Sequence, residues 1–205
     1  MIAIIDYGLG NLFSIYNMLK HIGVQAIITS NASEISNASK LILPGVGAFD
    51  EGMKLLSESG LDSLIKREVT NNGKPILGIC LGMQLLGTRS EEGEMRGLEL
   101  IDFKSIRFRE DRIGGLNVPH MGWERVEFVQ KNCGLLDGLY DSQRYYFIHS
   151  YHAVCKNKND EMIRCYYGYD FTAGVHKGNI YGVQFHPEKS HKYGMKLLEN
   201  YARNC

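Results

Sequence analysis

The stretch KPILGICLGMQLLG, residues 74–87, places a cysteine at the point where a strand pattern changes into a helical one. Residues 75–79 form a continuous apolar run, which is typical of a buried strand in a parallel sheet. A helical pattern begins directly after Cys80. With Gly78 and Gly82 on either side, Cys80 has the form of a nucleophile elbow, a sharp strand-to-helix turn that exposes a nucleophilic side chain. The stretch therefore predicts an α/β fold and indicates a reactive thiol.

The two glycines have a steric role in this prediction. A sharp turn forces the cysteine into strained backbone angles, and side chains beside it would collide. Free N–H groups at the start of the helix favour the thiolate, and the N–H of Leu81 would point toward a developing oxyanion. A buried, unreactive cysteine between packing glycines remains the alternative interpretation, so a partner base decides between the two.

Strand and helix patterns alternate through the first half of the chain and change in the second half. The first half has strand patterns at residues 2–6, 25–29, 40–47 and 75–79, and helical patterns at 11–23 and 49–73 with a break near Gly60. Such alternation predicts a parallel sheet. Short aromatic segments then predict further, partly antiparallel strands at residues 124–130, 144–154, 161–169, 171–178 and 180–186, followed by a helix at 192–204. We expect one domain, residues 1–205, with a mixed, mostly parallel sheet flanked by helices.

Composition excludes several classes of protein. Lysine plus arginine and aspartate plus glutamate each number 23, so the near-zero net charge gives no support for a nucleic-acid or anionic-membrane partner. The first residues lack the basic region of a signal peptide, and no segment is apolar for long enough to span a bilayer. Five widely spaced cysteines favour a reduced, cytoplasmic setting.

A base for the thiol is predicted at the end of the last strand pattern, in YGVQFHPEKS, residues 181–190. A cysteine nucleophile needs an imidazole to take its proton, which His186 can supply. The carboxylate of Glu188 can hold that imidazole in one tautomer. Because ligands bind beyond the carboxyl ends of strands in open α/β sheets, the segments GICLG, LPGVG and QFHPEKS are expected to form one site.

Other histidines and a metal site are the competing interpretations. His149 and His152 are rival bases, and a metal held by these two residues with His186 and Glu188 lacks the tight ligand spacing of known sites. We therefore expect no metal. No cofactor is expected either, since GLGNLF, residues 8–13, lacks the third glycine of a dinucleotide loop.

Taken together, GICLGMQLL, LPGVGAF and QFHPEKS resemble the motifs of class I, triad-type glutamine amidotransferases. More narrowly, IDYGLGNL, LPGVGAF, VPHMGW, YFIHSY and QFHPEKS resemble the glutaminase subunits of imidazole glycerol phosphate synthase, which serve histidine biosynthesis. The match runs from Asp6 to Ser190. The resemblance implies a flavodoxin-like amidotransferase fold and an enzyme that hydrolyses L-glutamine to glutamate and ammonia. In it Cys80 would attack the carboxamide, and His186 and Glu188 would complete the triad.

The resemblance also implies how substrate is held. The oxyanion hole would consist of the N–H of Leu81 and an N–H of the PGVG segment, at Val46 or Gly47. Glycines in that segment would let a peptide flip as an on/off switch, whereas a plain strand-ending turn is the alternative. The positions that match those holding the amino-acid end of glutamine are Gly45, Gln84, Glu92, Ser150 and Tyr151.

Nothing in the sequence has the form of an ammonia acceptor site, so a partner is expected to use the product. Ammonia in neutral water is mostly protonated, and a dry passage to the partner avoids this. The resembled family pairs with a (β/α)₈ cyclase subunit, which implies a heterodimer. Trp123 is either an interface anchor or a core aromatic residue. The interface candidates around the active-site mouth are Asn11, Pro119, His120, Met121, Trp123, Tyr146 and Lys189.

Two positions depart from the pattern of the histidine-pathway subunits. Glu124 follows Gly-Trp, where that family usually has asparagine, and Asn117 precedes VPHMGW, where it usually has lysine. The C-terminal stretch HPEKSHKYGMKLL is more similar to paralogues that supply ammonia to a sugar amidotransferase for surface polysaccharides. Histidine biosynthesis is the first prediction and the paralogue the second. A partner-independent cysteine hydrolase of peptides or γ-glutamyl compounds is the third, while a non-catalytic module would require a damaged triad.

Overall fold

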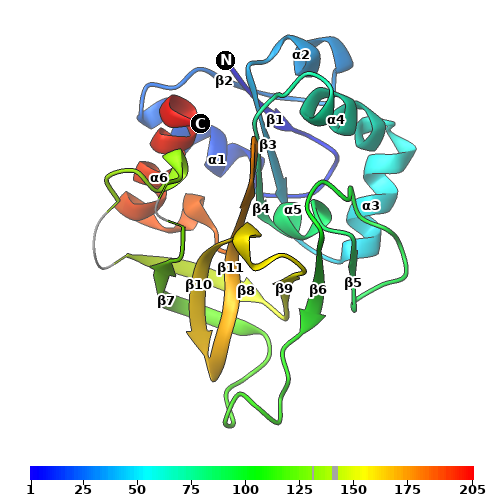
Figure 1. Ribbon diagram of the computed structural model, residues 1–205. Coiled ribbons are helices and arrows are strands. Elements are labelled where there is room, and N and C mark those ends of the chain that lie inside the picture. Colours follow the sequence, from blue (N-terminus) through cyan, green and yellow to red (C-terminus); the bar gives the residue numbers. More distant parts are fainter. Residues whose placement is uncertain (131, 140–142) are drawn as a thin grey trace.

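The computed structural model describes residues 1–130, 132–139 and 143–205, and its centre is a large mixed sheet. The main path of this sheet runs β2-β1-β3-β4-β12-β11-β10-β7-β8. Figure 1 shows the parallel strands and most helices in the upper part of the molecule and the antiparallel strands below. The predicted class, a mixed α/β sheet with parallel core strands and flanking helices, is confirmed.

Five parallel strands form the core of the sheet. They pair side by side in the order β2, β1, β3, β4 and β12. Side chains of β1, β4 and β12 are buried throughout, which explains their continuous apolar sequences. The strands are β1 (Ile2–Ile5), β2 (Ala26–Thr29), β3 (Lys40–Gly45), β4 (Ile76–Cys80) and β12 (Ile180–Val183).

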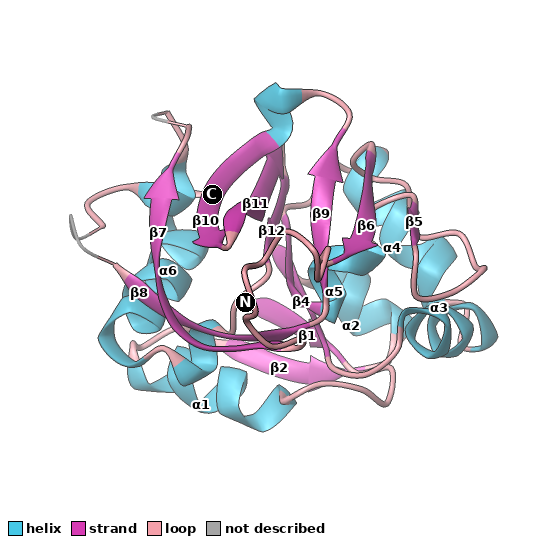
Figure 2. Cartoon of the chain, turned by 90° about the horizontal axis from the view of Figure 1, so that it is seen from below, coloured by secondary structure: helices cyan, strands magenta, loops and turns pink. Residues whose placement is uncertain are grey.

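Helices cover both faces of this parallel region (Figure 2). On one face, α1 (Leu12–His21) and α6 (His191–Asn204) bury apolar side chains in one core cluster. The other face carries α2 (Ala32–Asn37), α3 (Phe49–Glu58), α4 (Leu61–Thr70) and α5 (Leu81–Leu85). The predicted break at Gly60 is confirmed: this residue has a φ of 69° and separates α3 from α4.

The remainder of the described chain adds seven further strands and three short 3₁₀ turns. The strands are β5 (Arg89–Ser90), β6 (Phe103–Arg107), β7 (His120–Phe128), β8 (Arg144–His149), β9 (Tyr151–Cys155), β10 (Glu161–Tyr167) and β11 (Tyr169–Lys177). The turns are η1 (Gly134–Leu136), η2 (Lys158–Asp160) and η3 (Pro187–Lys189). Among these, β5 and β6 form a parallel pair, and the other pairs are antiparallel.

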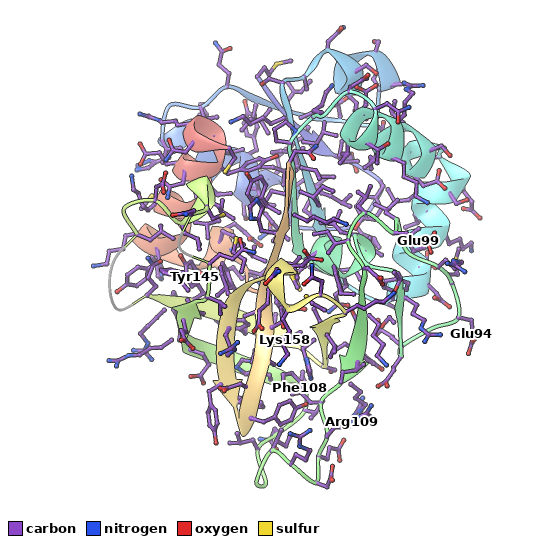
Figure 3. All side chains as sticks on the ribbon, in the orientation of Figure 1. Glu94, Glu99, Phe108, Arg109, Tyr145 and Lys158 are labelled. Atoms are coloured by element: carbon purple, nitrogen blue, oxygen red, sulfur yellow. The ribbon has the colours of Figure 1, made fainter. Side chains whose placement is uncertain are left out.

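An aromatic core supports the antiparallel region from within. Tyr145 of β8 stacks on Phe185 with ring centroids 3.9 Å apart, and Phe108 lies among the rings of His149, His152 and Phe171. Figure 3 shows Tyr145 and Phe108 on the lower half of the molecule, below the parallel strands. This core holds β8 against the end of β12.

Within the described ranges 1–130, 132–139 and 143–205, no helix combines the length and apolar character that a bilayer crossing requires.

Candidate active site

Cys80 occupies a strained turn at the carboxyl end of β4. Its backbone has φ 55° and ψ −111°, and α5 begins at the next residue. Positive φ is unfavourable for a residue with a Cβ, so the surrounding structure must impose it. A Cβ added at Gly82 would lie 1.8 Å from the carbonyl oxygen of Leu43, and one at Gly78 would lie 2.7 Å from that of Gly82. The predicted steric role of both glycines is confirmed.

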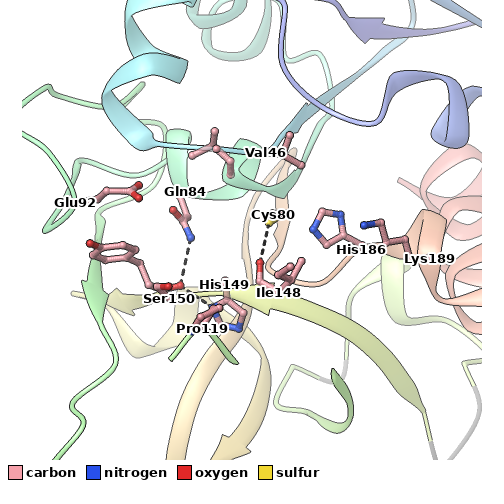
Figure 4. A pocket seen from close by; sticks show the side chains of 13 residues that line it. Val46, Cys80, Gln84, Glu92, Pro119, Ile148, His149, Ser150, His186 and Lys189 are labelled. Atoms are coloured by element: carbon pink, nitrogen blue, oxygen red, sulfur yellow. Dashed lines mark hydrogen bonds between the residues drawn. The ribbon is translucent and has the colours of Figure 1, made fainter. Parts of the chain in front are cut away.

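A cavity of about 440 Å³ opens beside the sulfur of Cys80 (Figure 4). It lies beyond the carboxyl ends of β3, β4 and β12, where the topology brings three separate segments together. The residues that line it are Val46, Gly47, Cys80, Leu81, Gln84, Glu92, Pro119, Ile148, His149, Ser150, Tyr151, His186 and Lys189. A pocket of this volume is large enough for a small metabolite.

His186 and Glu188 form a buried pair next to this cavity. The Nδ1 atom of His186 lies 2.8 Å from Oε1 of Glu188, and both side chains are almost fully buried. Because an ionised carboxylate only accepts hydrogen bonds, Nδ1 carries the proton and donates to Glu188. The other ring nitrogen, Nε2, is buried and makes no hydrogen bond within the described part of the chain. It is therefore free for proton exchange with a reacting group.

Strand β8 fixes the backbone on which His186 stands. The N–H of His186 donates to the carbonyl of Tyr146 at 2.9 Å. The hydroxyl of Ser190 donates to the carbonyl of His186 and accepts from the N–H of Tyr146. Pro187 starts the short turn that brings Glu188 back toward the ring. These hydrogen bonds join β8 to residues 186–190 and hold the backbone of His186 in place.

The electrostatic surroundings favour a protonated His186. Burial alone lowers the pKa of His186, but interactions with the neighbouring Cys80 and Glu188 outweigh it and raise the pKa to about 10. In Figure 4 the ring lies beside the sulfur of Cys80. The geometry therefore suits a protonated His186 beside the sulfur of Cys80.

The rival bases are placed less favourably. His149 lines the cavity, but its Nδ1 donates to the carbonyl of Tyr151 at 2.7 Å and its Nε2 faces Nδ1 of His120 at 3.0 Å. Burial, with the neighbouring His120, holds the pKa of His149 well below its usual value. His152 does not line the cavity and contacts the hydroxyl of Tyr169. Both rings therefore have structural partners, whereas His186 has a free nitrogen.

Most predicted substrate and oxyanion positions line the cavity. These are Val46, Gly47, Leu81, Gln84, Glu92, Ser150 and Tyr151. Gly45 differs, since it is buried and pairs in register with Cys80 in the adjacent strand. The carboxylate of Glu92 is exposed and accepts a hydrogen bond from the N–H of Phe49 at 2.8 Å. It is therefore held at the cavity edge by a backbone contact.

The predicted interface residues differ in how near they lie to the cavity. Pro119 and Lys189 line it, Met121 is 59% exposed, and Lys189 lies over the ring of Tyr146. Asn11 precedes α1 and is half-buried.

Trp123 and His120 each pack against other rings. The ring of Trp123, which is half-buried, stacks on His191 at 5.4 Å. The side chain of His120 does not fit the prediction of a surface contact. It is fully buried between the rings of Phe147 and Tyr167, because strand alternation turns it away from the face that carries Met121 and Trp123.

Sequence reasoning missed two residues at the sulfur. The carbonyl of Ile148 lies 4.0 Å from Sγ of Cys80, and Nε2 of Gln184 lies 3.7 Å from it. The location of Gln184, two residues before His186 on the same strand end, was a usable signal, whereas a backbone carbonyl leaves no trace in a sequence. The described residues contain no group of three His, Cys, Asp or Glu side chains that could hold a metal ion.

Comparison with known proteins gives close relatives over the whole chain. Residues 3–205 match the family model described as glutamine amidotransferase class-I. The protein "Imidazole glycerol phosphate synthase subunit HisH 2" of Methanococcus maripaludis is 51% identical over 205 residues, which covers 100% of each chain. A protein of the same printed name from Pseudomonas aeruginosa is 49% identical and covers 98% of each. "Imidazole glycerol phosphate synthase subunit HisH" of Sulfurimonas denitrificans is 48% identical, with 99% of this chain and 98% of that one covered.

Solved structures show the same fold at low sequence identity. One, described as a glutamine amidotransferase, has a TM-score of 0.73 at 19% identity and covers 98% of this chain and 99% of its own. Another, PurLQS from Thermotoga maritima, has a TM-score of 0.73 at 18% identity, covering 98% of this chain and 96% of its own. At these identities the likeness concerns the fold alone.

Proposed function

The chain belongs to the class I glutamine amidotransferase family, and on this premise we propose that it is the glutaminase subunit of an imidazole glycerol phosphate synthase. It hydrolyses L-glutamine to glutamate and ammonia for histidine biosynthesis, as one glutaminase domain spanning residues 1–205. The observation that carries the catalytic assignment is the shared cavity of Cys80 and His186, with Glu188 hydrogen-bonded behind the ring. We place the reaction in the cytoplasm, in keeping with five unpaired cysteines.

The first half of the reaction forms a glutamyl thioester. Nε2 of His186 takes the thiol proton, and the raised pKa of the ring, about 10, keeps the imidazolium present at neutral pH. The thiolate of Cys80 attacks the carboxamide carbon of glutamine, and negative charge develops on its oxygen. N–H groups at Leu81 and at Val46 or Gly47 would hold this oxyanion. His186 then gives its proton to the departing nitrogen, and ammonia leaves.

The second half regenerates the thiolate. A water molecule attacks the thioester carbon while Nε2 of His186 accepts one of its protons. The carbon–sulfur bond breaks, glutamate forms, and the thiolate of Cys80 again faces the imidazolium. Glu188 keeps the same hydrogen bond to Nδ1 in both halves, which holds the ring in the orientation that each proton transfer requires.

The amino-acid end of glutamine fits the opposite side of the cavity. Gln84, Glu92 and Ser150 lie there, on the far side from His186 (Figure 4), and Tyr151 also lines the cavity. A carboxylate at the cavity edge suits the ammonium group of the substrate, and backbone groups of residues 150–151 suit its polar end. The carboxamide then points toward the sulfur.

We further propose a heterodimer with a (β/α)₈ cyclase subunit that covers the cavity mouth. The names of the relatives, as synthase subunits, support a partner. The mouth carries exposed apolar side chains at Val46, Met121 and Ile148, which lose contact with water when a partner docks. Such a cover would keep released ammonia away from bulk water.

The sugar amidotransferase paralogue remains the second candidate because of Glu124 and Asn117. Glu124 lies on β7 opposite Tyr145, on the strand face away from Met121 and Trp123. Its charge contributes to the raised pKa of Cys165, about 12, after the larger effect of burial. The departure at Glu124 thus lies outside the cavity lining and leaves the residues proposed for glutamine hydrolysis unchanged.

Substitution of the nucleophile tests the proposed activity. We expect Cys80→Ala to lower glutamine hydrolysis by roughly a thousand-fold or more, because no other described side chain in the cavity is a thiol. Cys165→Ala, a buried cysteine outside the cavity, is the matched control. Steady-state release of glutamate measures both. Turnover by Cys80→Ala close to that of the parent chain would contradict the assignment.

A second assay determines which partner uses the ammonia. The chain is mixed in turn with a histidine-pathway cyclase and with a sugar amidotransferase, and glutamine-dependent product formation is measured. We expect product with the cyclase. Product only with the sugar amidotransferase would establish the second candidate, and hydrolysis of peptides without any partner would establish the hydrolase.

A further inference from the structure

A fully buried glutamine outside the cavity lining contacts the sulfur of Cys80. Gln184 directly follows β12 and has no exposed surface. Its Nε2 lies 3.7 Å from Sγ of Cys80, within hydrogen-bonding distance for a sulfur acceptor. A buried amide needs partners for its polar atoms. The triad chemistry described above makes no use of this contact.

A backbone carbonyl fixes which end of Gln184 faces the sulfur. The carbonyl of Tyr151 can only accept, so the Gln84 atom 3.3 Å from it is the donor, Nε2. The same Nε2 group lies 3.1 Å from the side chain of Gln184, which must present its oxygen there. The amide nitrogen of Gln184 is therefore the atom that points at Cys80. One set of donors is consistent with all three hydrogen bonds that link Tyr151, Gln84, Gln184 and Cys80.

This orientation matters because of the other polar group at the sulfur. The carbonyl of Ile148, 4.0 Å away, accepts a hydrogen bond from a neutral thiol and repels a thiolate. An amide N–H does the opposite, since it donates to a thiolate and strengthens with the negative charge. In a buried setting this difference is not screened by water.

We propose that Gln184 is a further catalytic residue: its Nε2–H donates to the Cys80 thiolate, while its Oε1 holds Gln84 at the substrate wall. The proposal rests on the proposed glutaminase function and deepens it. One side chain thus joins the nucleophile to a wall of the substrate cavity. When the thiolate attacks glutamine, the sulfur loses its negative charge to the new oxyanion, and the N–H contact weakens. Gln184 therefore raises the fraction of Cys80 that is ionised, and it does not raise the rate constant with which the thiolate attacks.

The test measures alkylation of Cys80 by iodoacetamide between pH 5 and pH 10, with the Cys80 peptide quantified by mass spectrometry. Gln184→Met keeps the volume and removes the donor. We expect the midpoint of the rate–pH profile to move upward by about one unit, a tenfold loss of rate below the midpoint. At the alkaline limit the rate should equal or exceed that of the parent chain. Gln184→Glu should move the midpoint further in the same direction.

The surrounding titratable groups and the control keep this readout specific. His186 and Tyr7 interact with Cys80, while His149, Glu92 and Lys189 line the same cavity, and the variants retain all of them. Gln143→Met is the matched control, because Gln143 is also buried and its side chain accepts from the hydroxyl of Tyr145. We expect no shift in the control.

The outcomes separate the role of Gln184 from packing and from the proposed function. A uniform loss of rate at every pH, or an unchanged profile, would overturn the donor role. If Gln184→Met does not fold, Gln84→Met frees the amide to rotate, and an unshifted midpoint there overturns the proposal as well. A shifted midpoint in Gln184→Met, found together with a parent chain that hydrolyses no glutamine with any partner, would support the donor role and contradict the proposed function.

Discussion

The sulfur of Cys80 is surrounded by groups with opposing preferences. A positive φ holds the residue in a conformation that costs about 1–3 kcal/mol, and the pairing of β4 with β3 and β12 supports it. The carbonyl of Ile148 can accept a hydrogen bond from the neutral thiol, whereas under the proposal above Nε2 of Gln184 donates to the thiolate. The reactivity of the thiol is therefore set by a few contacts rather than by the turn alone.

Glu188 is expected to act through the ring of His186. Glu188→Gln removes one of the groups that raise the pKa of His186, so the ring holds its proton less firmly at neutral pH. The amide can also stabilise the wrong tautomer. We expect kcat/KM for glutamine to fall by roughly 10³- to 10⁴-fold, as for an aspartate behind a catalytic histidine.

The control for this variant is Glu199→Gln, which removes a half-exposed carboxylate of α6 that pairs with Lys196 and Arg203. Its kcat/KM should stay within about twofold of the parent value, because surface ion pairs contribute little. Equal kcat/KM for Glu188→Gln and the parent chain would show that the carboxylate does not orient the imidazole.

At the scale of elements, the sequence predicted the strongly periodic segments and missed the short polar ones. Apolar runs and the left-handed Gly60 indicated the parallel strands and the break between α3 and α4. The six-residue helix α2 was missed, although Asn31 caps it by accepting from Ser33 and Glu34. The two-residue β5 exists because β6 pairs with it, and a pairing of this kind leaves no periodic pattern.

A buried ion pair connects α4 to its neighbours and gives a prediction at this scale. Glu68 lies 3.1 Å from Lys74, both are almost fully buried, and Lys74 also donates to the carbonyls of Ile35 and Ser36. Hydrogen bonds, foremost from Asn72, outweigh burial and lower the pKa of Glu68 to about 2. This carboxylate therefore stabilises the fold above its unfolded pKa of 4.5.

Glu68→Gln leaves the ammonium of Lys74 without its counter-charge. We expect the free energy of unfolding at pH 7 to fall by about 3–5 kcal/mol, measured by urea titration. The difference from the parent chain should shrink as the pH falls from 4.5 toward 2, where Glu68 itself is protonated. Glu58→Gln, at an exposed position of α3, should change stability by less than about 0.5 kcal/mol. A difference that persists unchanged to pH 2 would contradict the charge argument.

At the scale of the whole molecule, the strand order β3, β4, β12 brings the candidate site together. Residue types and strand ends were sufficient to predict Cys80, His186 and Glu188 as a group, because carboxyl ends of neighbouring parallel strands meet at one edge. The pattern could not show that β12 lies next to β4, nor that β8 supports His186. It also could not show that His120 faces inward, since that depends on the pairing register of β7 and β8.

The same arrangement places the cavity mouth on a surface with exposed apolar side chains, which leads to a prediction about the partner. We expect glutamine turnover to be low in the isolated chain and to rise strongly when the cyclase subunit is bound with its ligand, because a covered mouth completes the site.

Met121→Glu places a charge on the 59% exposed side chain beside the mouth and should weaken partner binding by roughly tenfold or more. Tyr166→Glu, at a 65% exposed position outside the cavity lining, is the control. Calorimetric titration gives the affinity, and glutamate release gives the turnover relative to each isolated variant. Equal turnover with and without the partner would refute the coupling, and equal affinities of the two variants would place the interface elsewhere.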